Sequence, residues 1–256
     1  MRNSQFNESS WTTMYDLSPN RVTRFLLSII ALLVVFNFVE RAVVYWLNTQ
    51  GNGQFVSIYF NFDQEANFPT LYSALALGFC SYLLATIATV SKNAREKYAK
   101  HWKYLAWIFL FLAIDEACSI HELLIPLMKR VVNAEGFLYF PWVIPASFLV
   151  AVFLLIFRKF IFALPTKTKT LFILSGMIYI FGALGMEVVG GYIADNQGYN
   201  TIYGIVSSIE ELLEMFGVVI FINALLSYLQ SQTSKLNFAL LFQQPRDNKA
   251  RFLKNI

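Results

Sequence analysis

The chain has 256 residues, of which 57% are hydrophobic and only 14% are charged. Soluble domains carry about 25% charged residues, so this composition argues against a soluble domain and predicts an all-α integral membrane protein. The formal net charge of +4 does not indicate nucleic-acid binding, because the basic residues lie in short loops beside apolar segments. This distribution is typical of a membrane protein, in which such residues set the orientation of the helices. We therefore expect the lipid bilayer, and not nucleic acid, to be the partner of this chain.

Six apolar segments follow one another along the chain, and each has about the length that a helix needs to cross a bilayer. We expect one six-helix transmembrane domain over residues 21–229, after a polar leader (1–20) and before a basic tail (230–256). The six predicted spans cover residues of about 22–47, 69–90, 104–128, 141–157, 170–193 and 201–229.

The basic residues are divided unevenly between the two sides of this predicted bundle. Of the 20 Lys and Arg residues, all but Arg41, Lys129 and Arg130 fall on the side that holds both termini. Positively charged loops stay in the cytoplasm. The sequence therefore predicts cytoplasmic N- and C-termini and a multi-pass location in the cell (inner) membrane.

Acidic residues interrupt three of the apolar segments, where a charge at the helix centre costs about 2.5–3.5 kcal/mol. These residues are Asp115, Glu116, Glu122, Glu187, Glu210, Glu211 and Glu214. Because no Lys or Arg lies among them, we expect protons or cations to balance their charge. Residue counts along the helices place Glu122, Glu187 and Glu210 at similar depths in the outer half of the bilayer, with Asp115 and Glu214 one or two turns deeper. The carboxylates are thus expected to meet in one site.

His121 belongs to the same stretch as three of these acids. Glutamates from several helices together with a histidine are typical of a divalent metal site. The predicted metal ligands are Asp115, His121, Glu122, Glu187, Glu210 and Glu214. Among these, Asp115, Glu122 and Glu210 are the predicted catalytic groups. Taken singly, His121 is more simply interpreted as a packed, hydrogen-bonded histidine, and the number of acids is what favours a site.

Three functions fit these residues. The first is a metal-dependent membrane enzyme that acts on a lipid or other apolar substrate by activating water or oxygen. The pattern departs from that of bundle di-metal sites, because the chain has no Glu-x-x-His motif within its apolar segments. The second is a proton or cation transporter that uses the acids as binding groups. The third is a non-catalytic membrane subunit or receptor.

Overall fold

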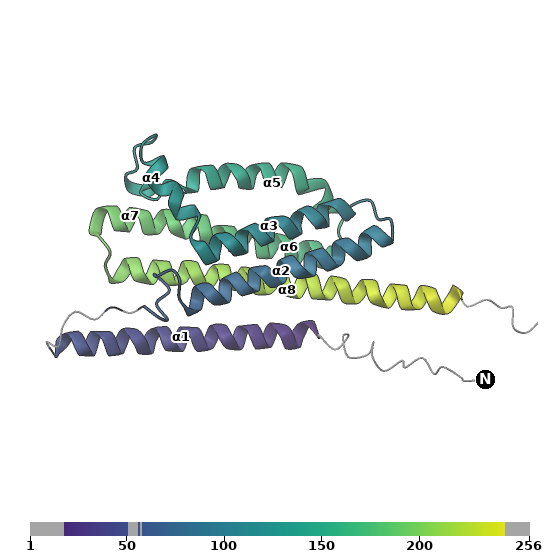
Figure 1. The fold of residues 1–256 in the computed structure, drawn as a ribbon, viewed down its shortest axis with the longest axis horizontal. Helices are drawn as coiled ribbons and strands as arrows, with labels where there is room; N and C mark the ends of the chain where they lie inside the picture. Colours follow the sequence, from purple (N-terminus) through teal and green to yellow (C-terminus); the bar gives the residue numbers. More distant parts are fainter. Residues whose placement is uncertain (1–17, 51–55, 57, 244–256) are drawn as a thin grey trace, which may run out of the picture.

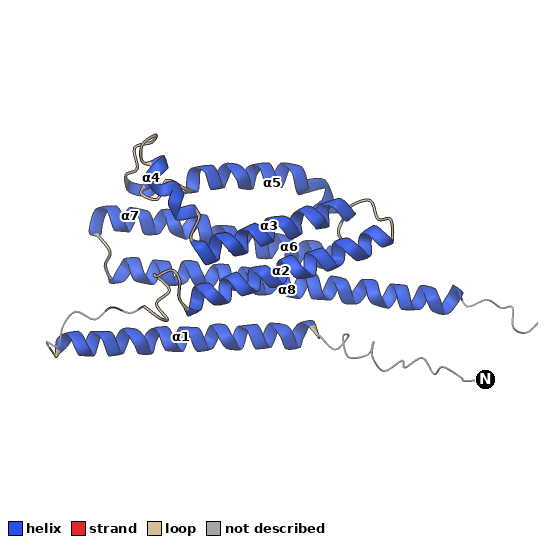
Figure 2. Ribbon diagram, viewed as in Figure 1, coloured by secondary structure: helices blue, strands red, loops and turns tan. Residues whose placement is uncertain are grey.

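The structure, a computed structural model, describes residues 18–50, 56 and 58–243. Within these residues all regular secondary structure is helical, which confirms the predicted all-α class (Figure 2). The long helices form an elongated bundle in which α1 and α5 lie at opposite edges of the view (Figure 1). Most of the predicted leader and the last 13 residues of the predicted tail (244–256) lie outside the described residues.

Five helical stretches are long and apolar enough to cross a membrane. Each begins within four residues of a predicted span, because an uninterrupted apolar run sets where such a helix starts. The last helix continues to Gln243, beyond its predicted end at residue 229. The five stretches are Pro19–Thr49 (α1), Phe68–Asn93 (α2), Val143–Ala163 (α5), Thr166–Gln197 (α6, η5 and α7 in sequence) and Thr201–Gln232 within α8 (Thr201–Gln243).

The remaining predicted span, residues 104–128, is not one continuous helix. It divides into three helices: α3 (Ala99–Cys118), the short 3-10 helix η3 (His121–Leu123) and α4 (Leu124–Met128). The prediction of a single helix over this range is therefore wrong. This break matters for the site, because it falls within the stretch that carries three of the six predicted ligands, Asp115, His121 and Glu122.

Ser119 causes the break by adopting a left-handed conformation, with φ 49° and ψ 43°. Few residues other than glycine adopt this conformation, so the surrounding contacts must favour it. Asp115 supplies two of them: its backbone carbonyl accepts a hydrogen bond from the Ile120 N–H (3.3 Å), and its side-chain Oδ1 accepts one from the His121 N–H (2.8 Å). As a result, Asp115, Ser119 and Glu122 do not share one helical face, contrary to the sequence-based expectation.

Close contact between two helices defines the centre of the bundle. Gly182, in the π-helical turn η5 (Phe181–Met186), packs against α8, where an added Cβ would lie 3.0 Å from the backbone oxygen of Glu210. Gly217 of α8 is packed as closely, because a Cβ added there would lie 3.0 Å from the backbone nitrogen of Tyr179. Small residues let helices in lipid approach closely. These two glycines therefore bring the acidic part of α8 against η5.

The loop between α1 and α2 is held in place by polar residues of α1. The Glu40 carboxylate accepts hydrogen bonds from the three successive backbone N–H groups of residues 58–60, at 2.7–3.1 Å. The next residue of α1, Arg41, donates from Nη2 to Oδ1 of Asn61 at 2.6 Å. These contacts fix the backbone a few residues before Glu65, and so determine which part of the bundle this loop faces.

Candidate functional site

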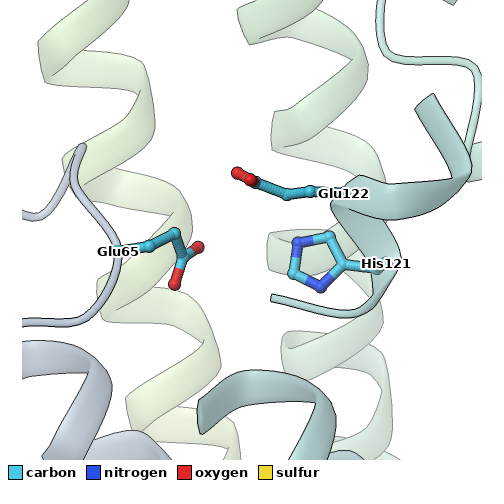
Figure 3. Close-up of side chains that lie close together, drawn as sticks. All are labelled: Glu65, His121 and Glu122. Carbon is cyan, nitrogen blue, oxygen red and sulfur yellow. The ribbon is translucent and has the colours of Figure 1, made fainter. Parts of the chain in front are cut away.

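Three side chains from two distant segments meet at one end of the bundle (Figure 3). Glu65 comes from the loop between α1 and α2, while His121 and Glu122 come from η3. Each side chain offers one ligand atom, and these atoms all lie within 4.8 Å of one another. Two ligands of one Zn²⁺ ion, each at about 2.0–2.2 Å, are at most about 4.4 Å apart, so small side-chain movements would place all three on one ion. We call these three residues the rim group.

Asp115 fixes the position of His121 within the rim group. Its Oδ1 accepts the backbone N–H of His121 at 2.8 Å, and its Oδ2 lies 3.2 Å from Nδ1 of the imidazole ring. Both side chains are mostly buried, with 19% of Asp115 and 24% of His121 exposed. Metal-binding histidines are usually oriented in this way, with a carboxylate on the second ring nitrogen. With Nδ1 engaged by Asp115, Nε2 is the ring atom that remains for a metal.

The substitution Asp115→Asn is expected to weaken divalent metal binding by about 10–100-fold, the usual cost of losing such an orienting carboxylate. The amide oxygen of the substituted side chain can still accept the His121 backbone N–H, so the turn is preserved while the negative charge on Nδ1 is lost. Titration with Mn²⁺ or Zn²⁺ measures the affinity. Because Asp115 raises the pKa of His121, the midpoint of the pH dependence should also shift to lower pH in the variant. A variant with weaker binding and an unshifted midpoint would point to a purely structural role.

The pKa values of two rim residues depend on their surroundings and on each other. Loss of hydration raises the pKa of Glu65, and the charge of Glu122 adds to this, while His121 opposes it. For His121, burial lowers the pKa, but the hydrogen bond and charge of Asp115 and the charge of Glu65 outweigh it, so that its pKa lies above the usual value. Glu65 and His121 thus bind protons more readily than the isolated side chains would.

The predicted residues Glu187 and Glu210 lie next to the rim group, further into the bundle. Glu187 accepts a hydrogen bond from Nε1 of Trp142 at 2.7 Å, and the Trp142 ring packs against the His121 ring with 4.7 Å between centroids. The Glu187 carboxyl group also interacts with that of Glu210 on α8. Glu210 in turn interacts electrostatically with Glu214, four residues later on α8.

The structure therefore brings the predicted residues together but divides them into two parts. His121 and Glu122 belong to the rim group, with Asp115 on the far side of the His121 ring. Glu187, Glu210 and Glu214 form an inner row of carboxyl groups, and their role as metal ligands stays a prediction. The sequence interpretation missed Glu65, because this residue lies in a loop between two predicted spans and not within an apolar segment. One signal was present: in a bundle with alternating loops, this loop and the end of the third predicted span lie on the same side.

An open cleft lies beside Glu65, between the loop, the start of α2 and the end of α3. Its volume is about 410 Å³, within the range of about 300–1,000 Å³ that small-molecule sites occupy. Most of the side chains along it are apolar or aromatic. The lining residues are Tyr59, Ala66, Asn67, Phe68, Thr70, Leu71, Ala74 and Ala117.

Comparison with known proteins gives one match. Residues 26–229 match a family described as "Domain of unknown function (DUF8692)". The matched region includes the whole rim group, the inner carboxyl groups and the cleft. No curated protein and no solved structure matches the chain.

Proposed function

The chain belongs to the DUF8692 family, whose description assigns no activity, and from its own residues we propose a metal-dependent membrane enzyme that acts on a lipid or other apolar substrate. The observation that carries this proposal is the rim group: a histidine and two glutamates, far apart in sequence, whose ligand atoms lie within 4.8 Å of one another. Imidazole and carboxylate ligands together suit divalent ions such as Zn²⁺, Mn²⁺ and Fe²⁺.

The proposed topology keeps six spans, with α3 as the sixth. This helix has 20 residues, which at 1.5 Å per residue reach about 30 Å, the thickness of the hydrocarbon layer. Its buried side chains, among them Trp102 and Leu105, belong to the same apolar core as those of α2 and α8. With six spans, both termini lie in the cytoplasm and the rim group lies near the outer surface of the cell (inner) membrane.

The residues around the rim group suggest how a hydrolytic reaction would proceed. Glu65, His121 and Glu122 would hold the divalent ion. When bound, such an ion would lower the pKa of a water molecule and so supply hydroxide near neutral pH. Asp115 holds the imidazole in position through Nδ1. Glu187 and Glu210 lie close by, and in its protonated form either carboxyl group would be able to give a proton to a leaving group.

Metal binding to the rim group is expected to weaken as the pH falls, beginning above pH ~6.5, the usual pKa of histidine. The reason is the raised pKa of His121, because the imidazolium form has no lone pair for a metal. Protonation of Glu65, whose pKa is also raised, adds to the loss at lower pH. The measurement is the increase in melting temperature on adding Zn²⁺ or Mn²⁺, followed from about pH 8 to about pH 5.5. An increase that is the same at both ends would contradict the assignment.

The decisive experiment for the enzyme is metal analysis combined with an activity assay. The purified protein is expected to hold one divalent ion per chain, and to hydrolyse ester- or amide-linked lipids only when that ion is present. Removing the ion with a chelator should abolish turnover, and adding it back should restore turnover. A protein that holds no divalent ion after purification and binds none on titration would overturn the proposal.

A second candidate function is cation or proton transport. The observation in its favour is the row of carboxyl groups that runs inward from the rim group through Glu187 and Glu210 to Glu214. Proton or cation flux into liposomes that is lost in Glu210→Gln, in a protein without hydrolytic activity, would favour this function over the enzyme.

A further inference from the structure

Asn67 and Thr70, two polar residues that line the cleft, already form hydrogen bonds with each other and with nearby backbone. Oδ1 of Asn67 accepts hydrogen bonds from the backbone N–H and the hydroxyl of Thr70, both at 3.1 Å. The amide nitrogen of Asn67 donates to the carbonyl oxygens of Asn61 and Gln64, at 2.6 Å each. A polar ligand would have to compete with these bonds, whereas an apolar ligand would leave them intact. The cleft is therefore suited to hydrocarbon.

The cleft and the rim group share their supporting segments. Ala66, which lines the cleft, directly follows Glu65, so their Cα atoms are about 3.8 Å apart. On the other wall, Ala117 lies between Asp115 and His121 in the chain. The cleft is therefore lined in part by residues that lie close in the chain to those of the rim group.

The edge of the cleft is formed by large apolar side chains that the protein itself leaves uncovered. Tyr59, Phe68 and Leu71 are 62%, 51% and 53% exposed. Phe68 and Leu71 belong to the first turn of α2, one of the helices apolar enough to cross a membrane. This edge is therefore in a position to meet lipid chains, which can enter from the side while their polar ends stay near the membrane surface.

We propose that this cleft binds the hydrocarbon chain of an amphipathic lipid, and that it thereby places the first polar group of the lipid at Glu65, His121 and Glu122. The inference rests on the proposed function and narrows it: the substrate is a lipid whose reacting ester or amide group directly follows a single bound chain. Recognition by chain burial explains why a site with three ionisable ligands lies beside a wall of uncharged residues.

The test uses the full-length protein in phospholipid nanodiscs and a fatty acid that carries a photoreactive diazirine in its chain. Mass spectrometry is expected to find the label on residues of the cleft. Ala74→Trp and Ala117→Trp each fill the cleft from a different wall, and each should reduce this labelling about tenfold, the weakening expected when about two methylene groups lose their burial. Ala85→Trp, on an exposed face of the same helix as Ala74, is the matched control and should label like the wild type.

Metal content is measured in every variant, so that the two proposals can fail separately. Reduced labelling in both filled variants with unchanged metal content supports the cleft as the chain-binding site. The chain-binding proposal is overturned if the filled variants are labelled as strongly as the Ala85→Trp control. It is also overturned if the label is found mainly on other helix faces. A wild-type protein that labels in the cleft but binds no metal retains the lipid site and overturns the enzyme.

Discussion

His121→Ala is expected to lose its divalent metal, with an affinity at least about 100-fold below that of the wild type, beyond the effect of losing an orienting residue alone. His121 supplies the one nitrogen ligand of the rim group, and its ring is fixed by Asp115 on one side and Trp142 on the other. Without it, two carboxylates from separate segments would have to hold the ion. Elemental analysis of the purified variant measures the stoichiometry, and competition with a chelator measures the affinity.

The other histidine of the chain provides the control. His101 of α3 packs among aromatic rings, stacked on Phe160 at 5.4 Å and edge-on to Phe157 at 5.7 Å. Its buried Nδ1 has no hydrogen-bond partner within the described part of the chain, so His101→Phe removes an unsatisfied atom and keeps the ring. This variant should retain the metal. Equal metal content in His121→Ala and His101→Phe would place the metal outside the rim group.

Gly182→Ala is expected to cause a large loss of stability, of about 1–3 kcal/mol, as is usual when a methyl group is forced into a filled space. The new Cβ would lie 3.0 Å from the backbone oxygen of Glu210, 3.0 Å from Cβ of Leu213 and 3.1 Å from Cγ of Glu214. Because one of these atoms belongs to the backbone, η5 and α8 would have to move apart. At about 2–4 °C per kcal/mol for a chain of this size, the melting temperature in detergent should fall by about 2–12 °C.

Gly176→Ala is the matched control on the preceding helix. Nothing lies within 4 Å of the position where its Cβ would be, and it occupies the interior of α6 (Thr166–Ile180). Alanine is favoured over glycine there by about 0.5–1 kcal/mol, so this variant should melt at the same temperature or higher. The same fall in melting temperature for both variants would mean that close packing of η5 against α8 does not explain the role of Gly182.

The sequence predicted the helical class and the approximate starts of five long helices, because each of these segments is mainly apolar and long enough to cross a bilayer. It did not predict the break after Cys118, because neither glycine nor proline marks that position. The left-handed Ser119 is accompanied by hydrogen bonds from Ile120 and His121 to Asp115, which become visible only when the chain is folded. The range 104–128 therefore appeared as one helix.

The sequence predicted every residue of the candidate site except Glu65. Acids inside apolar helices are conspicuous because of their cost, and this directed attention to Glu187 and Glu210, which the structure places side by side. Glu65 carries no such signal, because an acid in a polar loop does not have the free-energy cost of an acid inside an apolar helix. Its position depends on contacts that Glu40 and Arg41 of α1 make with residues 58–61, and the sequence does not reveal such pairings.

The π-helical turn η5 has a consequence for how this site can change. A π turn behaves as a single residue inserted into an α-helix, and such insertions are frequent at functional sites. If the six residues from Phe181 to Met186 changed to ordinary α-helical winding without loss of a residue, everything that follows would rotate by about 100°. Glu187 would then turn away from Trp142, and Gly190 and Gly191 would no longer face the rings of Tyr203 and Phe140 that they now contact. A change of winding in this turn would thus reorient a carboxylate without altering any chemical group, whereas deletion of one residue would leave the following helix near its present orientation.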